Sequence, residues 1–257
     1  MHLYYTDIWA INCMNDGQFN GKSIASNASG SGNLKRYLAF ILCFAFLRLP
    51  VNAAEDQKLI ALTFDDGPSG RFTQRLLDGL SERGVKATFL LCGYRMEQYP
   101  ELTQKIYEQG HEIGLHGYSH KTLENSCKEG ARQEIQKNMD LMPEGCKISF
   151  FRSPGGLCNE DVKEAAKEYG LSILLWSVDP KDWAIHDTNL ITKRVVSQVK
   201  DGDIILMHDM SDSSVDAALA IIDQLKRQGY RFITASELAA VKNISLVPGY
   251  EYRRFPS

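Results

Sequence analysis

Short apolar runs alternate with segments of helical spacing along most of the chain. Each apolar run has the length of a buried strand, and seven are present: 59–64, 87–92, 111–115, 148–152, 171–178, 203–207 and 231–234. Between them, apolar residues recur at the spacing of one helix face in six segments: 72–83, 100–109, 128–142, 160–169, 189–200 and 214–228. Asn159 has the character of an N-cap for the fourth helix, and Gly84 and Gly229 stand where two of the others end.

This alternation predicts about seven β–α units in a single α/β domain at residues 57–243, followed by a tail at 244–257. Parallel strands covered by helices satisfy the pattern, either as a doubly wound open sheet or as a barrel. In both architectures, active groups gather at the carboxyl ends of the strands. The polar residues considered below all follow predicted strands, so we expect them to meet at one edge of the sheet.

The chain before residue 57 differs from this pattern. Residues 1–33 are rich in Asn, Gly and Ser and lack apolar periodicity, so we interpret them as a disordered extension or as an error in assigning the gene start. Residues 34–53 resemble a secretion signal, with a basic pair, an apolar run at 37–47 and small residues for cleavage after Ala53. An uncleaved anchor and a buried core helix are the alternatives. We expect a secreted or cell-envelope protein without lasting membrane association.

Composition and charge narrow the classes of partner. The chain is 44% hydrophobic and 24% charged, as in ordinary globular proteins, and its net charge of -3 gives no electrostatic reason to expect nucleic acid as a partner. Four cysteines follow the expected signal: Cys92, Cys127, Cys146 and Cys158. Export would permit disulfides, and the four allow three full pairings, but free thiols or a single bridge fit equally well. We expect a monomer.

Two adjacent carboxylates, Asp65 and Asp66, end the first predicted strand. Neighbouring negative charges repel each other, and a bound cation or a division of roles relieves the repulsion. A simple turn is the alternative, because Asp-Gly-Pro favours turns.

His116 and His120 stand four residues apart, a spacing at which two imidazoles can share one metal. Together with a carboxylate they would suit Zn²⁺ or another divalent transition metal, whereas separated surface histidines are the simpler interpretation.

Three further strand ends carry candidate groups. Arg152 can orient a catalytic carboxylate, and Gly155 after it can bring a backbone N–H close to a ligand, although a surface Arg beside a turn also fits. Asp179 can orient a catalytic His, and Trp183 can form the wall of a sugar groove. Trp176 is expected in the core. His208 stands directly after an apolar strand, the place of a general acid or of a buried structural His.

Taken together, these five motifs resemble those of the polysaccharide deacetylases, the NodB-like carbohydrate esterases of family 4. The resemblance covers about residues 58–240, with the motifs in the family's order. It implies a distorted (β/α) barrel of about seven units. One departure is Gly155, which stands where the family usually has an aromatic residue, so the resemblance is weaker for substrate choice than for chemistry.

The resemblance also implies a role for each motif residue. Asp65 would be the general base, held by Arg152, and His208 the general acid, tuned by Asp179 in preference to Asp182. One divalent metal, Zn²⁺ first and otherwise Co²⁺, Ni²⁺ or Mn²⁺, would be held by three ligands: Asp66, His116 and His120. Substrate contacts would come from four residues: Pro154, Gly155, Trp183 and Leu206.

The implied activity is removal of N-acetyl groups from N-acetylglucosamine residues of a polysaccharide, with peptidoglycan as the preferred substrate. Chitooligosaccharides and acetylated xylan are alternatives within the same chemistry. A non-catalytic glycan-binding protein on the same fold is the alternative of another class, and it would be expected to lack a ligand, the base or the acid. All of these groups are present in the sequence.

Overall fold

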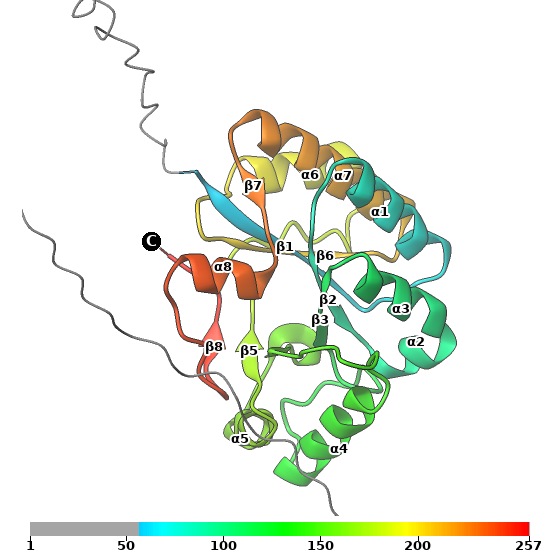
Figure 1. Ribbon diagram of the computed structural model, residues 1–257, viewed down its shortest axis with the longest axis vertical. Coiled ribbons are helices and arrows are strands. Elements are labelled where there is room, and N and C mark those ends of the chain that lie inside the picture. The colour runs from blue at the N-terminus through cyan, green and yellow to red at the C-terminus, as the bar shows by residue number, and fades with distance from the viewer. Residues whose placement is uncertain (1–56, 257) are drawn as a thin grey trace, which may run out of the picture. The chain divides into compact units, whose positions relative to one another are not determined.

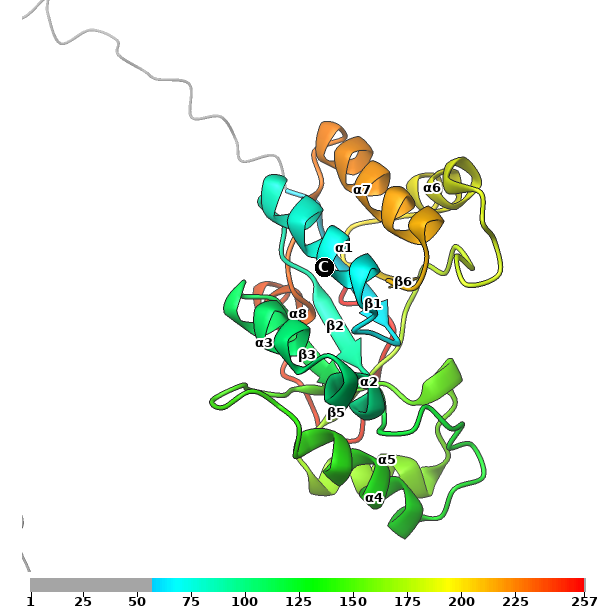
Figure 2. The same ribbon diagram turned by 90° about the vertical axis from the view of Figure 1, so that its right-hand side faces the viewer.

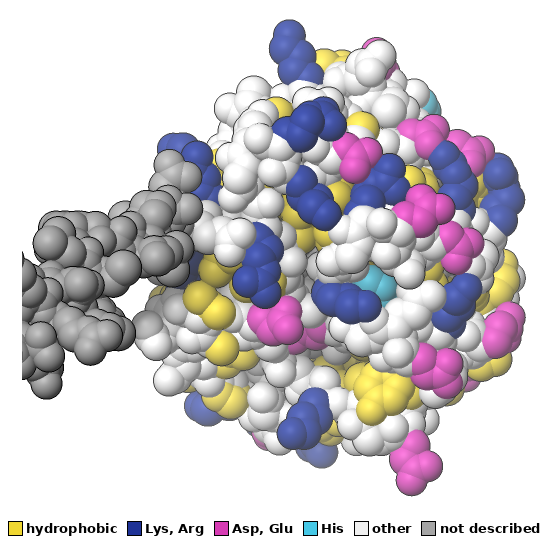
Figure 3. Space-filling view, turned by 45° about the horizontal axis from the view of Figure 1, so that its top comes forward, with side chains coloured by type: hydrophobic (Ala, Val, Ile, Leu, Met, Phe, Trp, Pro, Cys, Tyr) yellow, Lys and Arg dark blue, Asp and Glu magenta, His cyan; other side chains and the backbone are white. Residues whose placement is uncertain are grey.

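The computed structural model describes residues 57–256. The expected extension at 1–33 and the expected secretion signal at 34–53 lie outside the described residues, so both stay predictions. Within 57–256, no helix combines the length and apolar character that crossing a membrane requires. On the face shown in Figure 3, Lys and Arg side chains lie interspersed with those of Asp and Glu.

Eight strands of this part of the chain form one curled sheet (Figure 1), and neighbouring named strands pair in parallel. The strands are β1 (Leu59–Asp65), β2 (Thr88–Leu91), β3 (Glu112–Leu115), β4 (Phe150–Phe151), β5 (Ser172–Leu174), β6 (Ile204–His208), β7 (Arg231–Phe232) and β8 (Glu251–Tyr252). Their order is β6-β1-β2-β3-β4-β5-β8, with β7 beside the start of β1. Seven of them correspond to the seven predicted strands.

Helices surround the sheet (Figures 1 and 2): α1 (Arg71–Glu82), α2 (Gly93–Gln98), α3 (Pro100–Glu108), α4 (Lys128–Met139), α5 (Glu160–Glu168), α6 (Thr188–Val196), α7 (Asp212–Arg227) and α8 (Ala235–Val241). The six predicted helices are present, and Asn159 caps α5 by accepting a hydrogen bond from the Val162 N–H, as predicted. Two of the helices, α2 and α8, were not predicted from the sequence. A capping box between Thr234 and Glu237 marks the start of α8 and was a usable signal.

The sheet closes into a distorted barrel through the segment after β5. The Leu206 N–H donates to the Val178 carbonyl over 2.9 Å, which joins this segment to β6. β8 pairs with the edge of β5 that lies opposite β4, and Arg254 then bridges to Asp203 beside β6. The predicted barrel is therefore confirmed, but the predicted tail is wrong. Residues 251–252 complete the sheet, because Tyr252 and the fully buried Phe255 pack into the core.

Alternation along β1 separates two apolar layers. Ile60, Leu62 and Phe64 pack outward against the surrounding helices, whereas Leu59 and Ala61 join an inner cluster. Residues of α8, including Leu238, belong to the same inner cluster and cover the amino end of the barrel. By the same alternation, the next inward positions on β1 are Thr63 and Asp65. Asp65 therefore points into the carboxyl end of the barrel.

Candidate active site

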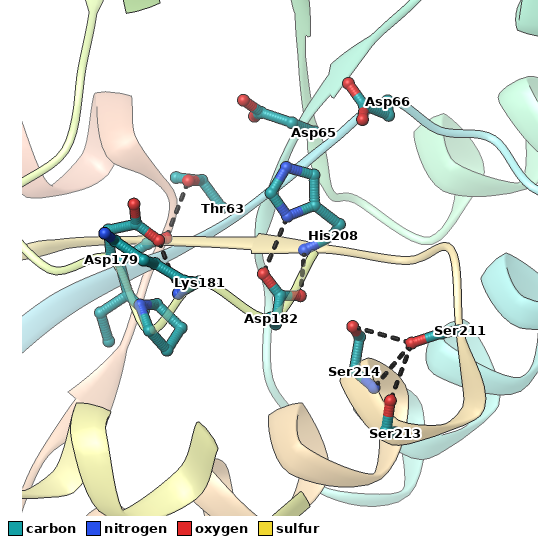
Figure 4. A network of polar contacts seen from close by, with 12 residues as sticks. Thr63, Asp65, Asp66, Asp179, Lys181, Asp182, His208, Ser211, Ser213 and Ser214 are labelled. Atoms are coloured by element: carbon teal, nitrogen blue, oxygen red, sulfur yellow. Dashed lines mark hydrogen bonds and ion pairs between the residues drawn. The ribbon is translucent and has the colours of Figure 1, made fainter. Parts of the chain in front are cut away.

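The carboxyl ends of the strands bring the predicted catalytic residues together. Asp65 is the last residue of β1, and the parallel register places it opposite His208, the last residue of β6. Figure 4 shows the His208 ring between Asp182 on one side and the Asp65–Asp66 pair on the other. Arg152 directly follows β4 and continues the inward direction of Phe150 two residues earlier.

Arg152 and Asp65 form a buried ion pair. The Arg152 side chain is fully buried, and its Nη1 lies 2.5 Å from Asp65 Oδ1 and 3.0 Å from Thr63 Oγ1. Its Nε and Nη2 donate to the carbonyls of Leu174 and Leu175 over 2.7 and 3.0 Å. Burial lowers the pKa of Arg152, and the Asp65 charge opposes that change. The guanidinium therefore fixes one Asp65 oxygen and leaves the other, Oδ2, 3.7 Å from His116 Nε2.

The three predicted metal ligands converge. Asp66 Oδ1 lies 3.2 Å from His116 Nε2 and 2.9 Å from His120 Nε2. One ligand atom from each residue lies within 4.8 Å of the other two. The contacts with both histidines outweigh the effect of burial and hold the pKa of Asp66 well below its usual range. Asp66 therefore presents an anionic oxygen to the two rings.

The tautomer of His116 shows that these residues fit a cation. His116 Nδ1 lies 2.7 Å from the Arg152 carbonyl, which can only accept, so this nitrogen carries the hydrogen. In the neutral ring, Nε2 then presents a lone pair to Asp66 Oδ1. That oxygen is buried, and although both imidazole Nε2 atoms lie close to it, it forms no hydrogen bond of normal geometry with a described residue. A divalent metal ion held by two imidazole nitrogens and one carboxylate oxygen satisfies all three atoms.

The backbone is strained at two of the three ligands. Asp66 and His120 have φ values of 71° and 59°, in the left-handed region that residues other than glycine rarely adopt. Such strain costs on the order of 1–3 kcal/mol per residue and concentrates at functional sites. The fold therefore holds these two ligands in conformations that their own backbones disfavour.

His208 pairs with Asp182 rather than Asp179. His208 Nδ1 lies 2.8 Å from Asp182 Oδ1, and the His208 N–H donates to Asp182 Oδ2 over 2.9 Å. Asp179 lies apart from the ring (Figure 4), and its Oδ1 accepts the Lys181 N–H over 2.7 Å. Our preference for Asp179 was therefore wrong. The turn 179–182 returns the chain towards β6, so the second carboxylate reaches the ring and the first stabilises the turn.

The pairing with Asp182 sets the charge of His208. Burial alone lowers the pKa of this ring, but the hydrogen bond and the charge of Asp182 outweigh it, with smaller contributions from Asp65 and Asp66. The pKa of His208 rises to about 9. The imidazole is therefore protonated at neutral pH, as a general acid must be before it donates.

Comparisons with known proteins agree with this geometry. Residues 52–174 match the family model described as polysaccharide deacetylase. A peptidoglycan-N-acetylglucosamine deacetylase of Bacillus cereus is 41% identical over 194 residues, which cover 73% of this chain and 91% of that protein. The chain belongs to the polysaccharide deacetylase family. The fold and family expected from the motifs are thus confirmed.

Two further relatives show the range of this family. A chitooligosaccharide deacetylase of Sinorhizobium fredii is 34% identical to this deacetylase over 64% of the chain and 78% of its own length. The solved structure of a family 4 acetyl xylan esterase from Clostridium thermocellum, in complex with a cobalt ion, matches with a TM-score of 0.73 at 31% identity. It covers 78% of this chain and 100% of that one.

The predicted substrate contacts of the deacetylase differ in exposure. The Trp183 residue is 61% exposed, and Leu206 is buried below His208 on β6. Gly155 has a φ of 72°, and a Cβ added there would meet no atom within 4 Å. The space beside Gly155 is therefore open at the position where the family usually has an aromatic side chain. Trp176 is partly buried against two core clusters.

Asp209 is a buried residue that was not among the candidates predicted from the sequence. Its carboxylate accepts a hydrogen bond from Thr73, and burial raises its pKa to about 6. A Cβ added at Gly67 would lie 2.7 Å from Asp209 Oδ1, so a larger residue there would displace the Asp209 carboxylate. Asp209 thus packs against the turn that follows Asp66. In the sequence, the one feature that could have pointed to Asp209 is its position directly after His208.

Proposed function

We propose that this deacetylase hydrolyses the acetamide of N-acetylglucosamine residues in peptidoglycan, with the aid of one divalent metal ion. The observation that carries this proposal is the convergence of three complementary groups at one edge of the barrel. These groups are a two-histidine, one-carboxylate ligand set, a carboxylate fixed by a buried Arg, and a His held in its protonated form. The reaction consumes water and yields acetate and a free amine.

Asp66, His116 and His120 would hold the metal, which would polarise the acetamide carbonyl and lower the pKa of water. Asp65 would take the proton from the attacking water, because Arg152 keeps its carboxylate oriented with Oδ2 unpaired by the guanidinium. His208 would give its proton to the departing amine nitrogen, since its pKa of about 9 keeps it charged at neutral pH. The Gly155 N–H would stabilise the developing oxyanion.

The donor set supports Zn²⁺ first and accepts Co²⁺, Ni²⁺ or Mn²⁺. The cobalt ion named for the acetyl xylan esterase supports a transition metal of this kind in the present chain as well. Activity is expected to disappear in the presence of a strong chelator and to return on addition of divalent metal. Activity that survives complete chelation, verified by metal analysis, would contradict a metal-dependent reaction.

The relative from Bacillus cereus supports peptidoglycan as the substrate, because it is named for that activity and the match covers 91% of its length. It also supports an extracytoplasmic location for this enzyme. Chitooligosaccharides are the second candidate, favoured by the Sinorhizobium fredii relative. Acetylated xylan is the third, favoured by the Clostridium thermocellum structure.

Acetate release from peptidoglycan, chitin oligomers and acetylated xylan, measured side by side, tests the assignment. We expect the highest kcat/KM on peptidoglycan. The Asp65→Asn variant should lose about 10²–10⁴-fold of the activity on every substrate, because it lacks the general base. Turnover of only chitin oligomers or xylan would overturn the substrate assignment, and unchanged acetate release by Asp65→Asn would overturn the base assignment.

A further inference from the structure

The loop 116–120, here called the histidine loop, carries two of the three proposed ligands, but it fixes them unequally. The His116 ring is almost completely buried, and the Arg152 carbonyl holds its Nδ1. The His120 side chain is 40% exposed, and within residues 57–256 its imidazole makes one close polar contact, to Asp66. The position of the His120 ring therefore depends on the backbone that presents it.

The middle of the histidine loop is held by backbone hydrogen bonds from the segment after β2. The Gly93 N–H donates to the Gly117 carbonyl over 3.0 Å, and the Tyr94 N–H donates to the Tyr118 carbonyl over 2.9 Å. Gly93 is needed for this approach, because an added Cβ would lie 3.0 Å from the Tyr118 Cα. These contacts end at Tyr118, two residues before His120.

Glu134 of α4 holds the next residue. Its Oε2 accepts the Ser119 N–H over 2.8 Å, and its Oε1 accepts the Ser119 hydroxyl, also over 2.8 Å. Both oxygens of one carboxylate thus bind the residue directly before His120. A hydrogen bond to a charged acceptor is stronger than a neutral one, and two of them fix orientation as well as position.

The helix that carries Glu134 is a firm support. Ala131 and Ile135 of α4 are fully buried in the cluster that contains Leu115 of β3. One turn after Glu134, the buried Asn138 accepts the His116 N–H over 3.2 Å. Residues four apart lie on the same side of a helix, so one side of α4 contacts the histidine loop at both His116 and Ser119.

We propose that Glu134 is a positioning residue for metal binding, which acts on His120 through Ser119. This inference rests on the metal site proposed above. His120 has a left-handed backbone, with a φ of 59°, that it would not adopt freely. The carboxylate of Glu134 holds Ser119 and so keeps the His120 imidazole next to Asp66 before a metal arrives. Without it, the loop would have to be ordered at the moment of binding, and that ordering would weaken the affinity.

The test is the metal dissociation constant of the purified chain after removal of metal with a chelator. Zn²⁺ and Co²⁺ are titrated in competition with a chromophoric chelator, and the absorption spectrum of bound Co²⁺ reports the ligand geometry. Removal of a residue that orients a ligand typically weakens affinity about 10–100-fold, and we expect this for Glu134→Ala. Ser119→Ala removes only the hydroxyl and should weaken binding less, as should Glu134→Gln.

Two comparisons separate positioning from a general loss of structure. Glu129→Gln alters a carboxylate on the same helix whose side chain is 66% exposed, and it should leave the affinity unchanged. The double variant Ser119→Ala/Glu134→Ala should bind metal no more weakly than Glu134→Ala alone, because both changes remove one interaction. The thermal midpoint of each metal-free variant shows that it is folded.

The outcomes distinguish this inference from the proposed function. A wild-type chain that binds no divalent metal would refute the metal site and the positioning role together. A wild-type chain that binds metal, with a folded Glu134→Ala variant of the same affinity and Co²⁺ spectrum, would refute only the role of Glu134. Weaker binding in Glu134→Ala with no change in Glu129→Gln would support it.

Discussion

The two ends of the barrel are lined by the same strands but by opposite kinds of side chain. At the amino end, Leu59 and Ala61 of β1 meet Leu238 of α8 in an apolar cluster. At the carboxyl end, the next inward positions of β1, Thr63 and Asp65, meet the buried Arg152. The first end stabilises the fold by burial, whereas the second must satisfy each polar atom individually. We therefore expect changes at the two ends to separate stability from activity.

The largest expected effect is at the carboxyl end. Arg152→Met leaves the Asp65 carboxylate buried without its partner, which typically costs about 3–5 kcal/mol of unfolding free energy. Acetate release should also be lost, because Asp65 would no longer be held in place. Urea unfolding followed by tryptophan fluorescence measures the first effect. The double variant Asp65→Asn/Arg152→Met should recover part of the stability but no activity, and a loss below about 1 kcal/mol in Arg152→Met would contradict the prediction.

At the amino end, Leu238→Ala should lower stability without altering the chemistry. Truncation of a buried Leu costs about 2–5 kcal/mol, and this side chain is fully buried in the inner cluster. The kcat measured at a temperature where the variant is folded should match the wild type. Val241→Ala, on the same helix at a position 58% exposed, serves as the matched control and should change stability by less than about 0.5 kcal/mol. A large fall in kcat for Leu238→Ala would show that the two ends are coupled.

A third prediction concerns the pH dependence at the carboxyl end. A general acid must be protonated, so activity should fall as the pH rises through the His208 pKa of about 9. Asp182→Asn removes the charge that raises this pKa, so the alkaline limb should move to lower pH. Asp179→Asn should leave the limb in place, since Asp179 bonds to the Lys181 N–H instead. Profiles of kcat against pH for the three proteins decide, and a larger shift with Asp179→Asn would reverse the assignment.

The smallest expected effect is at the rim of the site. Trp183 is 61% exposed, and its ring is proposed to lie against a sugar. Trp183→Ala should cost roughly 1 kcal/mol of substrate binding, or about five-fold in KM, with kcat nearly unchanged. Initial rates on a soluble oligosaccharide over a range of concentrations give both constants. An unchanged KM would place the sugar elsewhere, with the open space beside Gly155 as the next position to alter.

The predictions that failed concern residues whose place in the structure depends on contacts between distant segments. The motif Asp179-Pro180-Lys181-Asp182 contains two carboxylates after one strand, and only the path of the turn back to β6 selects Asp182. The segment 244–257 has too little periodicity to predict a strand, and β8 exists because it pairs with β5. Glu134 was not recognised as a candidate, although it lies on a predicted helix, because helical spacing does not show which loop a side chain faces.

The sequence by itself determined seven strands and six helices in their order along the chain, the placement of polar residues at strand ends, and the family. Apolar periodicity and local turn chemistry are properties of neighbouring residues, so they can be recognised without coordinates. Only the tertiary structure decided which carboxylate meets His208, which ring nitrogen of His116 carries the hydrogen, and how the barrel closes. Each of these depends on hydrogen bonds between residues far apart in the chain, whose partners are chosen by the packing of the whole domain.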